Sequence, residues 1–232
     1  MNLTVSSAPH IRGEENTRRI MLDVLIALVP ALIAAVILFG LRALVLTAVS
    51  AAACVIFELL LCLVMRRRNT VGNLSAVVTG VLLAFSVPVS TPYWTIILRD
   101  AFALIVGKGL VGGLGQNIFN PALGGRAFMM LFWPATITRA GVETVSAFEF
   151  GNVDMVASVT PMQNMHMGSL PADVSLLDMF LGTNHGGSMG EVCILALLIG
   201  FAWLLYRRVI SWRIPVAYVG TVAILALVFF KG

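Results

Sequence analysis

The chain has 232 residues, of which 59% are hydrophobic and 11% are charged, and its net charge is +4. Soluble domains carry roughly 25% charged residues and outer-membrane barrels alternate apolar with polar residues, so this composition and its unbroken apolar runs exclude both classes. The basic residues lie at the ends of apolar runs rather than in one stripe, which argues against nucleic-acid binding and leaves an all-α, polytopic membrane bundle.

Residues 1–19 form a polar N-terminal segment. The apolar run that follows is longer than that of a signal peptide and lacks a clear cleavage site, so we expect it to remain in the mature protein. A helix that crosses the bilayer core needs about 20 residues. On that length we expect seven apolar segments, some of them short: Ile20–Phe39, Ala43–Met65, Val71–Val87, Tyr93–Val111, Phe119–Pro134, Glu191–Tyr206 and Ile214–Phe230.

Two places interrupt the regular helix pattern. Two prolines lie within Ser86–Pro92, and a glycine-rich stretch runs from Gly107 into an Asn-Pro pair at Asn120 and Pro121. Non-helical backbone at membrane depth survives only where protein or a water-filled cavity satisfies its polar groups, so broken helices are expected. The glycines also suit close helix packing. Asn120 is predicted to be the N-cap of the next helix, with Pro121 at its first position.

Residues 135–190 form the long polar insertion between the membrane helices of 20–134 and those of 191–232. Positively charged loops stay in the cytoplasm. The basic clusters all fall on one side of the expected spans, which predicts a cytoplasmic N-terminus and an extracytoplasmic 135–190 loop. These clusters comprise Arg12, Arg18, Arg19, Arg66, Arg67, Arg68, Lys108, Arg207, Arg208 and Arg213.

Several stretches resemble one family. They are similar to the D-type membrane subunit of the Rnf electron-transport complex and to the related B-type subunit of the Na+-translocating NADH:quinone reductase. The resemblance covers residues 8 to about 165 and rests on Ala8–His10, Leu25–Ala31, Thr79–Phe85, Gly107–Ala122 and the Gly-Arg-Ala-Phe of Gly125–Phe128.

The resemblance implies a flavin mononucleotide (FMN) joined through a phosphoester to a threonine. Asp154–Thr160 aligns with the family's attachment motif, which makes Thr160 the acceptor and Asp154 and Ser158 supporting motif residues. Ala157 lacks the usual hydroxyl and Val159 is bulkier than the usual alanine. These departures bear on the efficiency of the flavin transferase rather than on which residue it modifies.

By the same resemblance, the chain relays electrons in a bacterial or archaeal inner-membrane complex that couples ferredoxin and NAD+ oxidoreduction to Na+ or H+ transport. Riboflavin is a further candidate cofactor. The implied partners are a second flavinylated subunit, iron–sulfur subunits and a flavin transferase. No G-x-G-x-x-G follows a strand, so NAD chemistry is not expected on this chain. The alternatives are the B-type quinone-reductase subunit, which normally has a longer N-terminal region, and a channel or solute transporter, which broken helices would also suit.

Charged residues inside membrane segments are functional candidates. Glu58 is the deepest carboxylate and a candidate for an ion path; alternatively, it reaches toward the interface near Arg66–Arg68. Arg126 is a second candidate, either facing a flavin phosphate or pairing with Glu58 or Asp100. Asp23, Arg99 and Asp100 are the remaining charged residues of the apolar segments.

No metal site is expected. Cys54, Cys62 and Cys193 have no C-x-x-C spacing and are predicted to be buried free thiols. His166 and His185 lie among methionines, but no fixed spacing supports a soft-metal site. The sequence stops at Gly232 directly after an apolar segment, which suggests that the chain is part of a longer protein with an inverted repeat.

Overall fold

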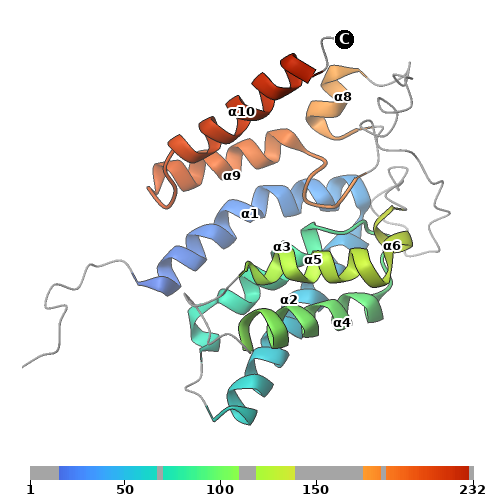
Figure 1. Cartoon of the computed structure of the whole chain (residues 1–232), viewed down its shortest axis with the longest axis vertical. Coiled ribbons are helices and arrows are strands. Elements are labelled where there is room, and N and C mark those ends of the chain that lie inside the picture. The colour runs from blue at the N-terminus through green and yellow to red at the C-terminus, as the bar shows by residue number, and fades with distance from the viewer. Residues whose placement is uncertain (1–15, 67–69, 110–118, 139–174, 184–186, 230–232) are drawn as a thin grey trace, which may run out of the picture.

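The structure is a computed structural model that describes residues 16–66, 70–109, 119–138, 175–183 and 187–229. Every regular element in these ranges is a helix, as Figure 1 shows. The all-α prediction is therefore confirmed for the described part of the chain.

Helices α1 (Thr17–Phe39) and α2 (Leu41–Val64) are the two described helices that are long and apolar enough to cross a membrane. Gly40 alone separates them, with φ 76°, and its N–H donates to the carbonyl of Val36. A residue with a Cβ rarely adopts this left-handed conformation, so glycine permits the reversal between two long helices. Pro30 lies inside α1 without ending it, as prolines in membrane helices often do.

The middle of the chain consists of shorter, interrupted helices. A 3-10 turn (η1, Val71–Asn73) precedes α3 (Ser75–Phe85), and α4 (Tyr93–Leu104) continues into a π-helix (η2, Ile105–Gly109). The 11 residues of α3 span only about 16 Å, roughly half of the bilayer core. It ends at Phe85, and because Phe85 and Val87 are buried, this end lies inside the molecule.

These interruptions explain why the described residues do not show seven full-length spans. Leu74, with φ 60°, splits the expected segment Val71–Val87 into η1 and α3, and the backbone turns at Ser86 before the prolines. Helix α5 (Pro121–Phe132) starts two residues inside the expected apolar segment Phe119–Pro134, at the predicted cap: the side chain of Asn120 accepts the N–H of Ala122. The predicted roles of Asn120 and Pro121 are thus confirmed.

Helix α2 lies at the centre of one group of helices, packed against α3 and α4, and α5 packs against α4. Helix α9 (Ile194–Tyr206) packs along α1. Two of these contacts depend on glycine: a Cβ on Gly80 of α3 would lie 2.7 Å from the Cα of Ala51, and one on Gly200 of α9 would collide with the carbonyl oxygen of Ala27. Small residues of this kind allow membrane helices to approach closely.

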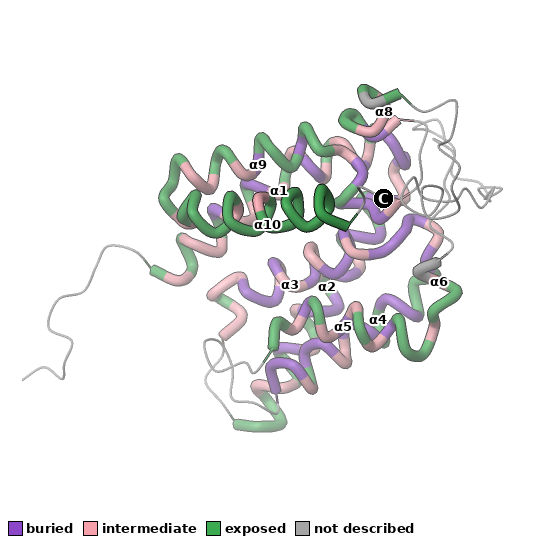
Figure 2. Tube along the Cα trace, turned by 45° about the horizontal axis from the view of Figure 1, so that its top comes forward, coloured by how far each residue is buried: buried purple, intermediate pink, exposed green. Residues whose placement is uncertain are grey.

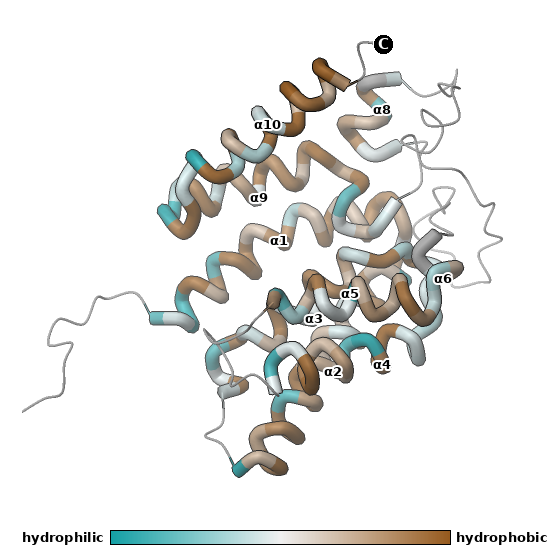
Figure 3. The backbone as a smooth tube through the Cα atoms, in the orientation of Figure 1, coloured by the Kyte–Doolittle hydropathy of each residue, from teal (hydrophilic) through white to brown (hydrophobic). Residues whose placement is uncertain are grey.

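The outer elements are the short helices α6 (Pro134–Thr138) and α8 (Leu176–Leu181) and the long helix α10 (Arg213–Phe229). No residue of α10 is buried, and the helix packs against none of the other described elements. Figure 2 shows most of it exposed, and Figure 3 shows that most of it is hydrophobic. Its surface is suited to lipid or to another protein segment, not to water.

The two ends of the bundle differ in what they carry. Figure 1 shows α6 and α8 at the end opposite the start of α1 and the turn between α9 and α10. Arg18 and Arg19 open α1, and Arg207 and Arg208 follow α9, so these basic clusters share one end. Their common position agrees with the charge pattern used to orient the chain.

Candidate functional site

The proposed flavin site falls outside the described residues. Thr160, Asp154 and Ser158 all lie within 139–174, and His166 and His185 are likewise outside the described ranges. The attachment motif therefore remains a prediction. The two candidates for the ion path, Glu58 and Arg126, are both described.

Glu58 lies on the inner face of α2 and is 2% exposed. Its Oε1 atom accepts hydrogen bonds from the ammonium of Lys108 and, at 2.5 Å, from the hydroxyl of Thr70. Lys108, which is also buried, donates a second hydrogen bond of 2.7 Å to the Ser75 hydroxyl. We call Glu58, Lys108, Ser75 and Thr70 the Glu58 cluster. It joins α2, η2, α3 and the residue before η1.

Glu58 is enclosed in the bundle with Lys108, and its other partner, Thr70, comes two residues after Arg68. Its second oxygen, Oε2, is buried and has no hydrogen-bond partner among the described residues. A buried carboxylate oxygen without a partner is costly, and such an atom marks a position where a ligand or water can bind.

A second buried ion pair joins two adjacent residues of α4. Arg99 and Asp100 are both 0% exposed, and Asp100 Oδ1 accepts from Arg99 Nη2 at 2.8 Å and from Nε at 3.0 Å. Arg99 Nη1 donates to the carbonyl of Leu83 at 3.0 Å, and Nη2 donates to the Ser50 hydroxyl at 3.3 Å. The Leu83 carbonyl also accepts from the N–H and the hydroxyl of Ser86, so the guanidinium adds a charged donor in the last turn of α3, where the helix dipole favours a positive charge.

Arg126 on α5 pairs with neither Glu58 nor Asp100. Its Nη1 lies 2.8 Å from Oε1 of Glu191, which sits before α9, and the two side chains are 34% and 56% exposed. Sequence reasoning missed this partner because Glu191 stood at the boundary of a predicted span. The pair leaves Arg126 on the surface of the described bundle and separate from the Glu58 cluster.

The segment that carries Glu191 is also tied to the end of α3 by its backbone. The N–H of Met189 donates to the carbonyl of Val87 at 3.1 Å, and the N–H of Gly190 donates to the carbonyl of Phe85 at 3.0 Å. A Cβ on Gly190 would overlap the side chain of Phe85. The chain leaving the 135–190 insertion therefore lies directly against the break in the α3 region.

Asp23 near the start of α1 forms a further ion pair, at the basic end of the bundle. Its two oxygens accept hydrogen bonds from Nε and Nη2 of Arg207, each at 3.1 Å. This two-pronged contact fixes the start of α1 to the end of α9. Its position near the helix ends, where Asp23 was expected, is typical of a structural link.

Lys108 is a buried partner of the site rather than one of the positive charges that end membrane segments. It is 8% exposed and bonded to Glu58, and sequence reasoning missed this role. Its flanking glycines, Gly107 and Gly109, are the feature of the sequence that could have indicated burial of Lys108, since they let the backbone there pack against α5 and α2. A Cβ on Gly107 would lie 3.1 Å from Pro121 Cα, and one on Gly109 would lie 3.0 Å from a Leu61 methyl carbon.

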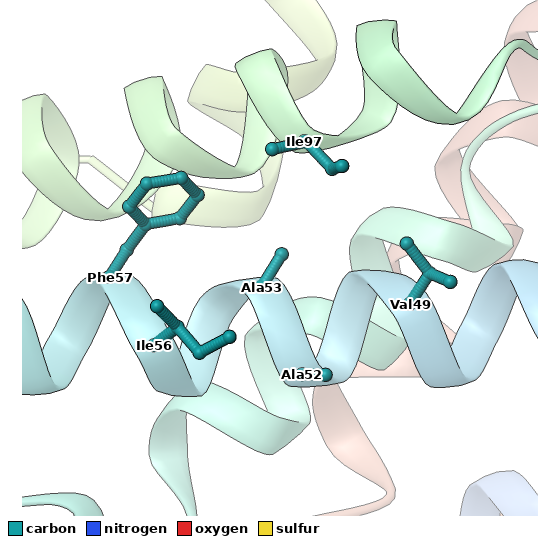
Figure 4. A pocket seen from close by; sticks show the side chains of 6 residues that line it. All are labelled: Val49, Ala52, Ala53, Ile56, Phe57 and Ile97. Carbon is teal, nitrogen blue, oxygen red and sulfur yellow. The ribbon is translucent and has the colours of Figure 1, made fainter.

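An apolar pocket of about 310 Å³ lies between α2 and α4 (Figure 4). Every lining side chain is apolar: Val49, Ala52, Ala53, Ile56, Phe57 and Ile97. Ligand sites normally add a few convergent polar groups to such a surface, and this pocket has none.

The described residues contain no group of three or more His, Cys, Asp or Glu side chains that could hold a metal ion. No disulfide joins Cys54, Cys62 and Cys193. Cys54 is buried, as expected, whereas Cys62 and Cys193 are only half-buried.

Comparisons with known proteins agree with the resemblance seen in the sequence. The model of the NQR2, RnfD, RnfE family matches residues 4–232. The chain is 43% identical over 228 residues to the D-type subunit of the Na(+)-translocating ferredoxin:NAD(+) oxidoreductase complex of Acetobacterium woodii, covering 98% of this chain and 70% of that protein.

Two other relatives are more distant. The corresponding subunit of the proton-translocating ferredoxin:NAD(+) oxidoreductase complex of Clostridium ljungdahlii is 36% identical over 97% of this chain and 69% of its own length. That of the ion-translocating oxidoreductase complex of Ectopseudomonas mendocina is 32% identical over 100% of this chain and 71% of its own length.

Proposed function

Because this chain belongs to the NQR2, RnfD, RnfE family, we propose that it is a membrane subunit of an Rnf-type, ion-translocating ferredoxin:NAD+ oxidoreductase. The observation that carries the proposal is the 43% identity to a D-type subunit of such a complex over 98% of the chain. The two long apolar helices support a place in the membrane. The inner membrane of a bacterium or archaeon is the proposed location, with the 135–190 segment outside.

The proposed cofactor is FMN on Thr160, attached through a phosphoester. The motif Asp154–Thr160 supports it, as does the position of this motif in a polar segment between membrane helices. The isoalloxazine ring would carry the electrons, while the protein holds and tunes it. Asp154 and Ser158 are proposed to serve the recognition of the motif by the flavin transferase.

In-gel fluorescence tests the attachment. Chain co-expressed with a competent flavin transferase is separated under denaturing conditions, and the band is expected to fluoresce. The Thr160→Ala variant should lose that fluorescence, whereas Thr144→Ala, in the same 135–190 segment, should keep it. A fluorescent Thr160→Ala band would mean that another residue accepts the flavin. Riboflavin held without a covalent bond would leave the protein on denaturation and appear in the supernatant.

The partners are proposed to be the other subunits of the complex, including a second flavinylated subunit and iron–sulfur subunits. Turnover of the purified complex distinguishes the two redox branches of the family. Ferredoxin-dependent reduction of NAD+ is expected. Quinone-dependent NADH oxidation without ferredoxin turnover would instead assign the chain to the quinone-reductase branch.

The proposed ion path runs by Glu58, with Arg126 as a second candidate. Glu58 is supported by its burial and by its unpartnered oxygen. Arg126 is supported only by its half-exposed pair with Glu191. The names of the relatives include both a Na+-translocating and a proton-translocating complex, so the transported ion is proposed only as a monovalent cation.

A further inference from the structure

The Glu58 cluster holds one positive charge in an oxygen-lined position. The ammonium of Lys108 contacts Glu58 Oε1 and the Ser75 hydroxyl, and Thr70 donates its hydroxyl proton to the same carboxylate oxygen. Carboxylate and hydroxyl oxygens are the ligands that hard cations prefer. The ammonium therefore occupies a place that could also receive a small monovalent cation.

Within the described residues, Glu58 keeps one free acceptor. Its Oε2 atom is buried and has no partner there, so a second ligand could bind to it beside, or in place of, the ammonium. Asp100 Oδ2 is also buried and unpartnered, so the difference between the two ion pairs lies in their cations.

The backbone that carries Lys108 differs from that of the other buried cation. Lys108 lies in the π-helix η2 between Gly107 and Gly109, whereas Arg99 lies in the regular helix α4. A π-turn contains one residue more than an α-turn, so a return of η2, which follows α4 directly, to α-helical bonding would rotate its side chains by about 100°. Flanking glycines lower the backbone cost of such a change.

The number of hydrogen bonds also separates the two cations. The Arg99 guanidinium is held by Asp100, by the Leu83 carbonyl and by Ser50. The Lys108 ammonium has two partners, both oxygens of side chains. Lys108 is thus a flexible point charge in a π-helix, whereas Arg99 is held in place by its hydrogen bonds in a regular α-helix.

We propose that Lys108 is a tethered cation that closes the ion path by occupying Glu58, and that the transported monovalent cation takes its place when η2 rearranges. This inference rests on the proposed function, because it requires Glu58 to lie on the path. In the open state the ion neutralises Glu58, whereas the displaced Lys108 ammonium loses its counter-charge. The cost of that unpaired charge disfavours the open state at rest, and while Lys108 is in place the transported ion cannot bind at Glu58 Oε1.

The test uses the whole complex in sealed vesicles, with ²²Na+ uptake and a pH-sensitive dye as separate arms for the two ions. Lys108→Met removes the tethered cation. We expect the resting complex to leak one of the two ions, and the number of ions transported per electron to fall while ferredoxin-dependent turnover continues. The resting Lys108→Arg complex, which keeps the positive charge, should not leak either ion.

Two further variants test whether a change in transport or leak comes from the tethered cation or from the loss of a structural ion pair. Glu58→Gln combined with Lys108→Met leaves no charge in the cluster and should abolish both transport and leak. Exchange of the two residues, Glu58→Lys with Lys108→Glu, keeps the ion pair but places the lysine on the regular helix α2. This variant should assemble and be tight but fail to transport, whereas a merely structural ion pair would leave transport intact.

Each outcome bears on one proposal. Coupled, leak-free transport by Lys108→Met overturns the tethered-cation inference. Normal transport by the exchange variant overturns it as well. If Lys108→Met fails to assemble, the exchange variant alone decides the question. Transport that persists in Glu58→Gln alone removes Glu58 from the path. Absence of ferredoxin-driven transport in the unaltered complex would instead overturn the proposed function.

Discussion

At the scale of single residues, the described part of the molecule buries charges only in pairs. Arg99 with Asp100 and Lys108 with Glu58 lie inside the bundle, where an isolated charge would cost several kcal/mol. The two pairs differ in what the cation contacts. Arg99 holds the end of a helix through the Leu83 carbonyl, so its contribution is structural, whereas Lys108 donates its hydrogen bonds to side chains.

Replacement of Arg99 by methionine is therefore expected to destabilise the protein. Removing one partner of a buried pair costs about 3–5 kcal/mol, because the other charge stays buried, and here the hydrogen bond to the Leu83 carbonyl is also lost. Thermal unfolding of the detergent-purified protein measures the effect. The double variant Arg99→Met with Asp100→Asn is the matched control and should recover part of the loss. Equal stability of Arg99→Met and the unaltered protein would show that Asp100 is not charged here.

At the scale of helices, close approach is set by small residues on the inner faces. Gly80 brings α3 against α2 at Ala51, and Ser50 on α2 donates its hydroxyl proton to the Gly80 carbonyl at 2.8 Å. The same hydroxyl accepts from Arg99, so the helix contact and the buried ion pair share one atom. A shift of α3 away from α2 would consequently disturb the charge on α4.

Gly80→Ala is expected to destabilise the α2–α3 contact, because its Cβ would lie 2.7–2.9 Å from backbone atoms of Ser50 and Ala51. Overpacking of this kind costs about 1–3 kcal/mol. Gly220→Ala on α10, where no atom lies within 4 Å of the added carbon, is the control and should not destabilise. Chemical-denaturant unfolding of the two variants side by side gives the comparison, and equal midpoints would contradict the packing argument.

The helices whose boundaries could be predicted from the sequence are those that depend on local chemistry. Asn120 and Pro121 begin α5 as expected, and α1 ends at Phe39 as expected, before a glycine. The partners of charged side chains were not predictable in this way. Glu58 and Lys108 are 50 positions apart, and Arg126 and Glu191 are 65 apart, so only the packing of α2, η2, α5 and the start of α9 decides which charges meet.

At the scale of the whole molecule, the charge pattern predicts which end faces the cytoplasm. Ser169→Cys in the 135–190 segment and Ser211→Cys in the α9–α10 turn test it, each in a background with Cys54, Cys62 and Cys193 replaced by alanine. A membrane-impermeant maleimide added to intact cells should label the first variant only. Both should react once the membrane is opened, which controls for exposure. Labelling of Ser211→Cys in intact cells would reverse the orientation.

The two backbone hydrogen bonds from Met189 and Gly190 to Val87 and Phe85 have a mechanical consequence. They attach the chain at the end of the 135–190 segment to the C-terminal end of α3. The Leu83 carbonyl of the same helix accepts a hydrogen bond from Arg99, and its first residue, Ser75, accepts one from Lys108. A displacement of residues 188–190 must therefore either break these two hydrogen bonds or move α3 with them. Residues 189 and 190, at the end of the 135–190 segment, and the two buried cations are thereby connected through one helix, α3.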